Sequence, residues 1–319
     1  MLSIQFRKIA VATLMAVAAW NSCTTKLEAH GFEGDRFFPP TVATDDPFAT
    51  DELSLPTISF FNNPASADGV TPKTREIDIS SEFDKEIFPK FALGVTETEI
   101  FLKPQGQTGT NGFDNLSLSA KYQVFENAPH EFILSVGGEV DLGGSGSKQI
   151  GADSYSTYTP TLYYGKGMGD LPNALKYLKP FAVTGTLGYA IPGEAGNADG
   201  SLNPDVLQWA FALEYSLPYL QQHVEEVEWL RPLKDFIPLV EFSMETPVNR
   251  GSGFTTGTIN PGVLWESKYC QIGAEAQIPV NGSTGPNIGA IFQVQFFIDD
   301  LFPKVFGHPI FFNHEDDDK

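Results

Sequence analysis

The 319-residue chain has few cysteines, few basic residues and no long apolar run. Its two cysteines, Cys23 and Cys270, cannot build the disulfide framework of a small secreted domain. A transmembrane helix needs about 20 consecutive apolar residues, and no stretch of the chain supplies them. Twenty Lys and Arg stand against 40 Asp and Glu, a net charge of -20, which argues against nucleic acid as a partner.

The beginning of the chain has the features of a secretory signal peptide. A basic pair at residues 7–8 precedes an apolar stretch at 9–20 that is too short to span a bilayer, and polar residues follow. Cleavage after Ala29 makes residues 1–29 the signal peptide, and residues 17–19 offer an earlier cut. Lipidation at Cys23 is disfavoured because the residues before it match a lipoprotein signal poorly. The sequence therefore predicts an exported protein.

Residues 53–298 repeat one unit, a run of about ten residues that alternates apolar with polar side chains and ends in a turn or loop. In residues 206–217, every odd position from Leu207 to Leu217 is apolar or aromatic, whereas the even positions from Gln208 to Ser216 are polar or small. Such runs occur at 53–61, 75–85, 89–102, 114–125, 131–142, 155–166, 179–191, 206–217, 237–248, 256–266, 270–280 and 287–298. We expect an all-β fold, a transmembrane up-and-down antiparallel β-barrel of about twelve strands.

The connections between these runs are of two kinds, which take turns along the chain. Loops rich in Gly, Asn, Ser and Thr alternate with tight or partly helical connections. Around the second kind lie Phe88, Phe91, Phe125, Phe132, Tyr163, Tyr177, Phe181, Tyr215, Tyr219, Phe236, Trp265 and Tyr269. Such an aromatic belt is typical of a membrane–water boundary, and an even strand number places both termini at this end, which we expect to be periplasmic. The alternative is a soluble sandwich with aromatic residues at one end, which seldom needs so many strands.

The acidic side chains fall largely on the polar face of the predicted strands. A charge that faces lipid costs about 2–4 kcal/mol near the bilayer midplane, so we expect these acids to face the lumen. The pore-lining candidates are Glu76, Asp78, Glu82, Asp84, Lys121, Glu139, Asp141, Glu214, Glu241, Glu245 and Glu275. Because Lys121 is the clearest base among them, an open pore should favour cations. The alternative is a barrel that is packed shut.

Two segments lie outside the repeat. Residues 30–52 show no period, and we expect a periplasmic N-terminal segment that either plugs the mouth of the barrel or leads into its first strand. Residues 299–319 should form a periplasmic C-terminal extension with an acidic end.

No catalytic site and no cofactor are predicted. The histidines are His30, His130, His223, His308 and His314, and none falls inside a predicted strand, so a Ser–His nucleophile has no evident position. A mature chain that begins at His30 could hold copper through its amine and imidazole. No second histidine is spaced to complete that site, and the metal question stays open.

The signal peptide, the alternating strands, the Gly-rich loops and the late run at residues 289–297 resemble bacterial outer-membrane β-barrels. The closing strand of such barrels carries alternating apolar residues and an aromatic end that the assembly machinery recognises. Within that class, residues 260–264 resemble the transporter-like barrels associated with degradation of aromatic compounds. The resemblance covers residues 53–298 and implies the outer membrane of a Gram-negative bacterium, with lipid and the barrel-assembly machinery as partners. One departure is that the chain continues past Phe297.

The function expected from these observations is passage of a small solute or cation through a monomeric channel with an acidic lumen. A plugged barrel with a structural or partner-scaffolding role is the alternative, and an outer-membrane enzyme is third.

Overall fold

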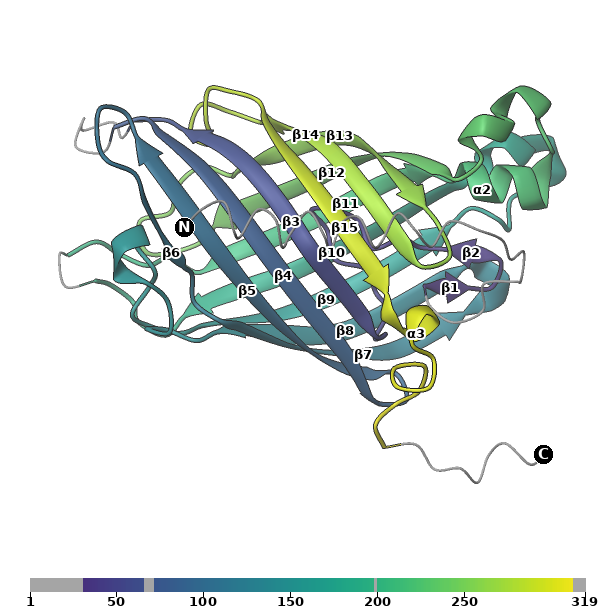
Figure 1. Ribbon diagram of the computed structural model, residues 1–319, viewed down its shortest axis with the longest axis horizontal. Helices are drawn as coiled ribbons and strands as arrows, with labels where there is room; N and C mark the ends of the chain where they lie inside the picture. Colours follow the sequence, from purple (N-terminus) through teal and green to yellow (C-terminus); the bar gives the residue numbers. More distant parts are fainter. Residues whose placement is uncertain (1–30, 66–71, 198–199, 312–319) are drawn as a thin grey trace, which may run out of the picture.

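The computed structural model describes residues 31–65, 72–197 and 200–311. The predicted signal peptide and His30 lie outside the described residues, and so does His314. The described chain forms a long β-barrel with most of its short helical segments at one end (Figure 1). None of the described helices is long and apolar enough to cross a membrane.

Twelve antiparallel strands form the barrel wall, and the last pairs with the first to close it. They are β3 (Glu52–Asn63), β4 (Thr74–Phe88), β5 (Phe91–Pro104), β7 (Ser117–Asn127), β8 (Phe132–Asp141), β9 (Thr157–Gly167), β10 (Phe181–Pro192), β11 (Val206–Tyr215), β12 (Phe236–Pro247), β13 (Thr256–Glu266), β14 (Cys270–Pro279) and β15 (Gly289–Phe297). Each predicted run lies on one of these strands. The predicted up-and-down barrel of twelve strands is confirmed.

The two ends of the barrel differ, as the two kinds of connection predict. We call the end that carries connections 89–90, 128–131, 168–180, 216–235 and 267–269 the turn end, and the opposite end the loop end. Short helices lie in the turn-end connections: η1 (Ala128–His130), η3 (Asn173–Leu178), α2 (Leu217–Tyr219), η4 (Leu220–Val224) and η5 (Glu228–Leu233). The loop end carries η2 (Lys148–Ile150). The first and the last described residues both lie at the turn end (Figure 1).

The strand predicted at 114–125 begins at Ser117 instead, and an additional short strand precedes it. A short strand, β6 (Thr110–Phe113), pairs with the loop-end half of β5, and β7 pairs only with the turn-end half. Glycines at positions 106, 109 and 112 break the alternation before β7, and Gly106 has a positive φ of 76°. Two strands, β6 and β7, therefore share the pairing edge of β5.

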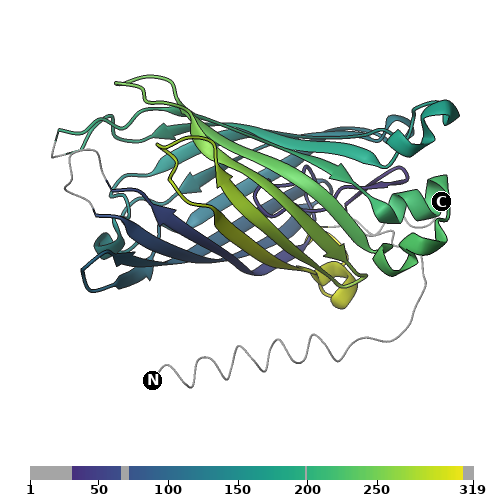
Figure 2. The ribbon, with the colours of Figure 1, turned by 90° about the horizontal axis from the view of Figure 1, so that it is seen from above.

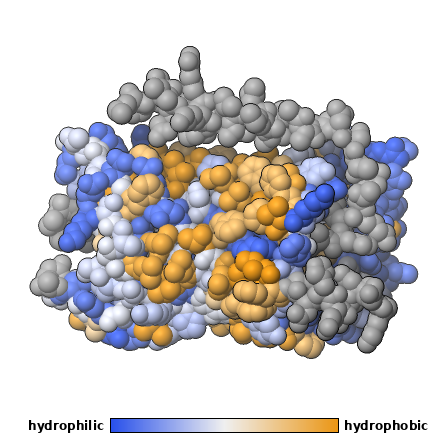
Figure 3. Space-filling view, turned by 60° about the horizontal axis from the view of Figure 1, so that its bottom comes forward, coloured by the Kyte–Doolittle hydropathy of each residue, from blue (hydrophilic) through white to orange (hydrophobic). Residues whose placement is uncertain are grey.

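The outer face of the barrel is apolar along its middle. Large apolar side chains stand exposed on alternate positions of many strands, among them Leu93, Leu118, Val136, Leu187, Leu213, Ile272 and Phe292. Figure 3 shows such side chains gathered across the middle of one face, with hydrophilic ones toward the two ends. An exposed apolar area of this extent marks a surface that meets lipid.

The predicted aromatic belt needs a correction. Phe88, Phe125 and Tyr177 are exposed at the turn end, as a belt requires. Tyr163 and Tyr219 are buried inside instead. The Tyr163 side chain shares the inward face of β9 with Thr159, and the Tyr219 ring lies in α2 against a buried arginine. Proximity to the turn end alone did not separate the two groups of rings.

Residues 31–51, which we call the luminal segment, enter the barrel from the turn end and return to it where β3 begins. Figure 2 shows this part of the chain enclosed by the strands. Its two short strands, β1 (Phe32–Glu33) and β2 (Arg36–Phe37), pair only with each other and add nothing to the barrel wall. Most residues from 36 to 49 are buried, since the barrel surrounds them.

After β15 the chain forms α3 (Ile298–Leu301) and then lies against the turn end of β4. The backbone N–H of Phe311 donates to the carbonyl oxygen of Ile87 at 2.9 Å, and the Phe311 ring stacks on Phe88. Phe297, the aromatic end of the closing strand, is fully buried and points inward, where its ring packs edge-on against Phe37 of the luminal segment.

Candidate functional site

The predicted pore-lining residues occupy two different parts of the lumen. Glu82, Asp84, Lys121, Glu214, Glu241 and Glu275 surround the luminal segment in the half of the lumen near the turn end. Glu76, Asp78, Glu139, Asp141 and Glu245 share the same strand faces nearer the loop end. The luminal segment therefore covers one group of acids and leaves the other group uncovered.

A buried arginine clamps the luminal segment to the turn end. The Nε of Arg36 donates to Oε2 of Glu131 at 3.2 Å, and its Nη1 donates to the carbonyl oxygen of Pro180 at 3.1 Å. The guanidinium also lies over the Tyr219 ring, 3.7 Å from its centroid, and the Tyr219 hydroxyl donates to Oε1 of Glu131. These partners come from three separate turn-end connections, so one side chain ties the segment to all three.

Apolar packing holds the segment against strands β12 to β15. The side chains of Phe37 and Val42 pack in one buried cluster with Ile237, Leu264 and Phe297, which point inward from the barrel wall. Burying an apolar side chain of this size stabilises a contact by about 1.5–3 kcal/mol. A second buried cluster joins Phe38 and Phe48 of the segment to Ile133 and Ala182 on other strands.

Glu241 holds the far end of the segment by its backbone. One carboxylate oxygen accepts from the N–H of Val42 at 2.8 Å, and the other accepts from the N–H of Ala43 at 3.0 Å. Nearby, Nε2 of Gln271 donates to the carbonyl oxygen of Pro40 at 2.6 Å. The fully buried carboxylate of Glu241 therefore accepts hydrogen bonds from the segment and is not exposed to an open lumen.

Val42 rests on a position that carries no side chain. A Cβ atom added to Gly273 of β14 would lie 2.4 Å from Cγ2 of Val42 and 3.8 Å from its Cβ. The absence of a side chain at Gly273 therefore lets the segment approach the wall. Positions 42 and 273 also lie at the Cβ–Cβ separation that is usual for a disulfide.

Charged groups face the segment on the opposite side of the lumen. The ammonium of Lys121 contacts both carboxylate oxygens of Asp45, the nearer at 2.8 Å, and donates to the backbone oxygen of Asp46 at 2.9 Å. The same ammonium lies 4.8 Å from the centroid of the buried Tyr163 ring. Gln123 accepts a hydrogen bond from the N–H of Ala49 at 2.7 Å. Polar contacts, rather than apolar packing, position the segment here.

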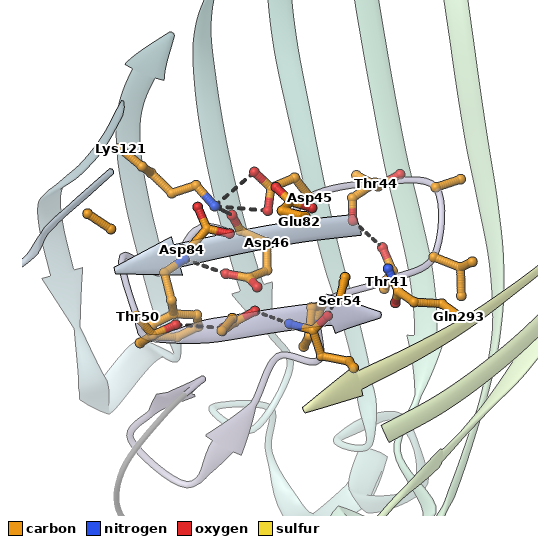
Figure 4. A pocket seen from close by; sticks show the side chains of 17 residues that line it. Thr41, Thr44, Asp45, Asp46, Thr50, Ser54, Glu82, Asp84, Lys121 and Gln293 are labelled. Carbon is orange, nitrogen blue, oxygen red and sulfur yellow. Dashed lines mark hydrogen bonds and ion pairs between the residues drawn. The ribbon is translucent and has the colours of Figure 1, made fainter. Parts of the chain in front are cut away.

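A pocket of about 230 Å³ remains between the segment and this charged side (Figure 4). Its walls come from residues 40–52 and from strands β3, β4, β5, β7 and β15. The charged side chains in its lining are Asp45, Asp46, Glu52, Glu82, Asp84 and Lys121. The apolar side of the segment is packed, whereas its charged side leaves room for a small guest.

The acids nearer the loop end lie in a wetter environment. Glu139 and Glu245 are exposed. Asp78 accepts a hydrogen bond from the Ser59 hydroxyl at 3.1 Å, and Asp141 accepts one from Ser117. Their geometry is that of a polar lumen lining in which neighbouring hydroxyl groups stabilise the carboxylates.

The described histidines take part in turn-end contacts. The His130 ring is mostly exposed, and its hydrogen bond to Asp170, at 3.0 Å, lowers the pKa of that carboxyl. Nδ1 of His223 lies 3.9 Å from Asp35, and its ring packs on Tyr219. Across the described ranges, no three His, Cys, Asp or Glu side chains come together at the spacing of a metal site. The candidate copper ligand His30 lies outside those ranges.

Sequence reasoning missed the clamp formed by Arg36, Glu131 and Tyr219. Arg36 and Glu131 are 95 residues apart, and no local pattern pairs them. One feature of the sequence indicates where the segment packs. Ile237, Leu264 and Phe297 are apolar residues at positions that the alternation assigns to the inward face. Apolar side chains that point into a lumen need something apolar to cover them.

Comparison with solved structures supports the fold. The chain is similar to the COG4313 outer membrane channel from Pseudomonas putida F1, with a TM-score of 0.55 and 10% identity over 81% of this chain and 99% of that one. It also matches the KdgM porin, with a TM-score of 0.42 and 14% identity over 76% of this chain and 98% of that one. No protein-family model and no curated protein matches the sequence.

The closed barrel, its apolar outer face and this likeness define the class of protein. The described chain is a closed twelve-stranded β-barrel with a lipid-facing exterior, and its fold is that of bacterial outer-membrane barrels.

Proposed function

We propose that this barrel is a channel for a small solute or cation, closed by its luminal segment and opened when that segment moves. One observation carries the proposal: residues 31–51 fill the turn-end half of the lumen without adding a strand to the wall. Their displacement would leave every ladder of the barrel intact. The turn end then faces the periplasm, and the loop end faces outward.

The charge of the lumen favours cations as the permeating species. Acids dominate the inward faces of the strands near the loop end, where Glu139 and Glu245 are exposed, and Lys121 is held by the luminal segment. Acidic rings of this kind select cations in other channels. The expected reversal potential under a KCl gradient is therefore that of a cation-selective pore.

A permanently closed structural or scaffolding barrel is the second candidate. The buried clamp on Arg36 favours it, because breaking a buried ion pair by removing one partner costs about 3–5 kcal/mol. A catalytic role, the third possibility, would need a nucleophile beside a histidine, whereas His130 and His223 face Asp170 and Asp35.

An engineered disulfide tests the gate directly. Val42→Cys and Gly273→Cys place two Cβ atoms at about the separation that a disulfide needs. The pair is introduced with Cys270→Ser, since Cys270 is a free thiol in the described chain. In planar bilayers, we expect the oxidised protein to conduct rarely and dithiothreitol to restore the openings of the unmodified channel.

The matched control is Cys270→Ser alone, which dithiothreitol should not affect. Migration on a denaturing gel before and after boiling shows that each variant has formed a barrel. Equal conductance of the oxidised and reduced double-cysteine protein would contradict gating by the segment. Silence of the unmodified protein over many insertions would instead favour the permanently closed barrel.

A further inference from the structure

The pocket beside the luminal segment has far more negative than positive charge. Its lining contributes five carboxylates and one ammonium, so the fully ionised pocket would carry a net charge of -4. Carboxylates withdrawn from water need nearby positive charge or hydrogen-bond donors. The lining therefore calls for a cationic guest.

Four of these five carboxylates have no ion-pair partner among the described residues, and two of the four, Glu82 and Asp84, have no hydrogen-bond donor there either. Lys121 is taken by Asp45 and by the backbone oxygen of Asp46. Within the described chain, no ion pair reaches Glu82 or Asp84, although both line the pocket. These neighbouring inward residues of β4 thus offer a pair of carboxylates to a guest.

A buried amide provides a second and independent indication. The side chain of Gln293 lines the same pocket and is only 8% exposed. Its Nε2 donates to the Thr57 hydroxyl at 3.2 Å, whereas no donor among the described residues reaches its Oε1. A buried acceptor without a donor is costly, so the guest should bring donors.

An ammonium group meets these requirements best. It carries three donors and no acceptor, and the carboxylates of Glu82 and Asp84 and the Oε1 of Gln293 are acceptors without a donor; the unpaired Thr44 hydroxyl can also accept. The described carboxylates are not grouped as a metal site would need. Lys121 is an example of such an interaction within the chain. Its alkylammonium lies between the carboxylate of Asp45 and the face of the Tyr163 ring.

The size of the pocket limits the guest. Its volume of about 230 Å³ lies below the range of about 300–1,000 Å³ that is usual for drug-sized ligands. We infer that the pocket binds a short aliphatic diamine, with one ammonium on Glu82 and Asp84 and the other among the remaining acceptors. The inference rests on the proposed function in one respect, because the diamine is then a solute that enters through the lumen.

Calorimetric titration of the purified full chain with 1,4-diaminobutane tests this inference. We expect saturable binding at one site, and none with succinate, which has the same carbon number and the opposite charge. Glu82→Gln combined with Asp84→Asn should weaken binding by at least about tenfold, because two charge-assisted contacts are lost. Glu245→Gln, which changes an inward acid outside the pocket, should bind as the unmodified protein does.

Absence of diamine binding to the unmodified protein, equal binding of succinate, or unchanged binding by the double variant would overturn the inference. Migration on a denaturing gel before and after boiling shows whether the double variant has formed a barrel. If it has not, the single variant Glu82→Gln is titrated in its place. The binding assay needs no current. A protein that binds diamine but never conducts refutes only the channel, and one that conducts without binding refutes only the diamine site.

Discussion

The two sides of the luminal segment are held by different physical means. On the side of β12 to β15, Phe37 and Val42 pack in a buried apolar cluster, and Glu241 accepts two backbone N–H groups. On the side of β3, β4 and β7, the contacts are ionic, and a pocket remains. Dense packing fixes position and tolerates little movement, whereas charged contacts can exchange partners with ions and water. The packed side is suited to anchor the segment and the charged side to receive a guest.

The largest effect is expected from loss of packing on the anchored side. Phe37→Ala removes a ring that is 7% exposed and that packs against Phe297, and such truncations cost about 3–5 kcal/mol. Because the lost contacts join the segment to the wall, the barrel should persist while the segment loosens. We expect frequent openings in planar bilayers and faster proteolysis within residues 31–51.

Phe292→Ala is the matched control for this change. Phe292 lies on the outer face of β15, where it is 47% exposed and points away from the luminal segment. An equal rise in openings for both variants would show that a loosened wall, and not a released segment, opens the pore.

A smaller effect is expected at Glu241. Glu241→Gln keeps the shape of the side chain but turns one acceptor into a donor that faces a backbone N–H of Val42 or Ala43. An unsatisfied buried donor costs about 1–3 kcal/mol, so the open probability should rise, though less than for Phe37→Ala. Single-channel recording measures this difference. The control is Glu245→Gln, on the same strand face, which should leave the open probability unchanged and shift only the cation selectivity. An equal rise in open probability for Glu245→Gln would contradict a specific contact between Glu241 and the segment.

The difference between these two glutamates marks what the sequence could predict. Strand alternation is a local property, so it places Glu241 and Glu245 on the same inward face, and it predicts the twelve strands. Whether an inward acid meets water or protein depends on a segment some 200 residues away in the chain, which approaches Glu241 through Val42 and Ala43. The segment makes its contacts through backbone groups, a lone arginine and apolar side chains that follow no period, so its sequence does not indicate where it binds. The sequence could therefore predict which acids point inward, but not whether water or protein surrounds each of them.

The smallest effect on gating is expected on the charged side, at Lys121. The ammonium holds Asp45, whose side chain is 47% exposed, and such partly exposed pairs contribute about 1 kcal/mol or less. Lys121→Met keeps the apolar stem and removes the charge, so the open probability should change little.

The current should nevertheless become more cation-selective, since a base is lost from an acidic lumen. Reversal potentials under a KCl gradient, recorded beside the open probability, separate these effects. If Lys121→Met opened the channel as strongly as Phe37→Ala, ionic contacts would anchor the segment as firmly as packing does, and the distinction between the two sides would fail.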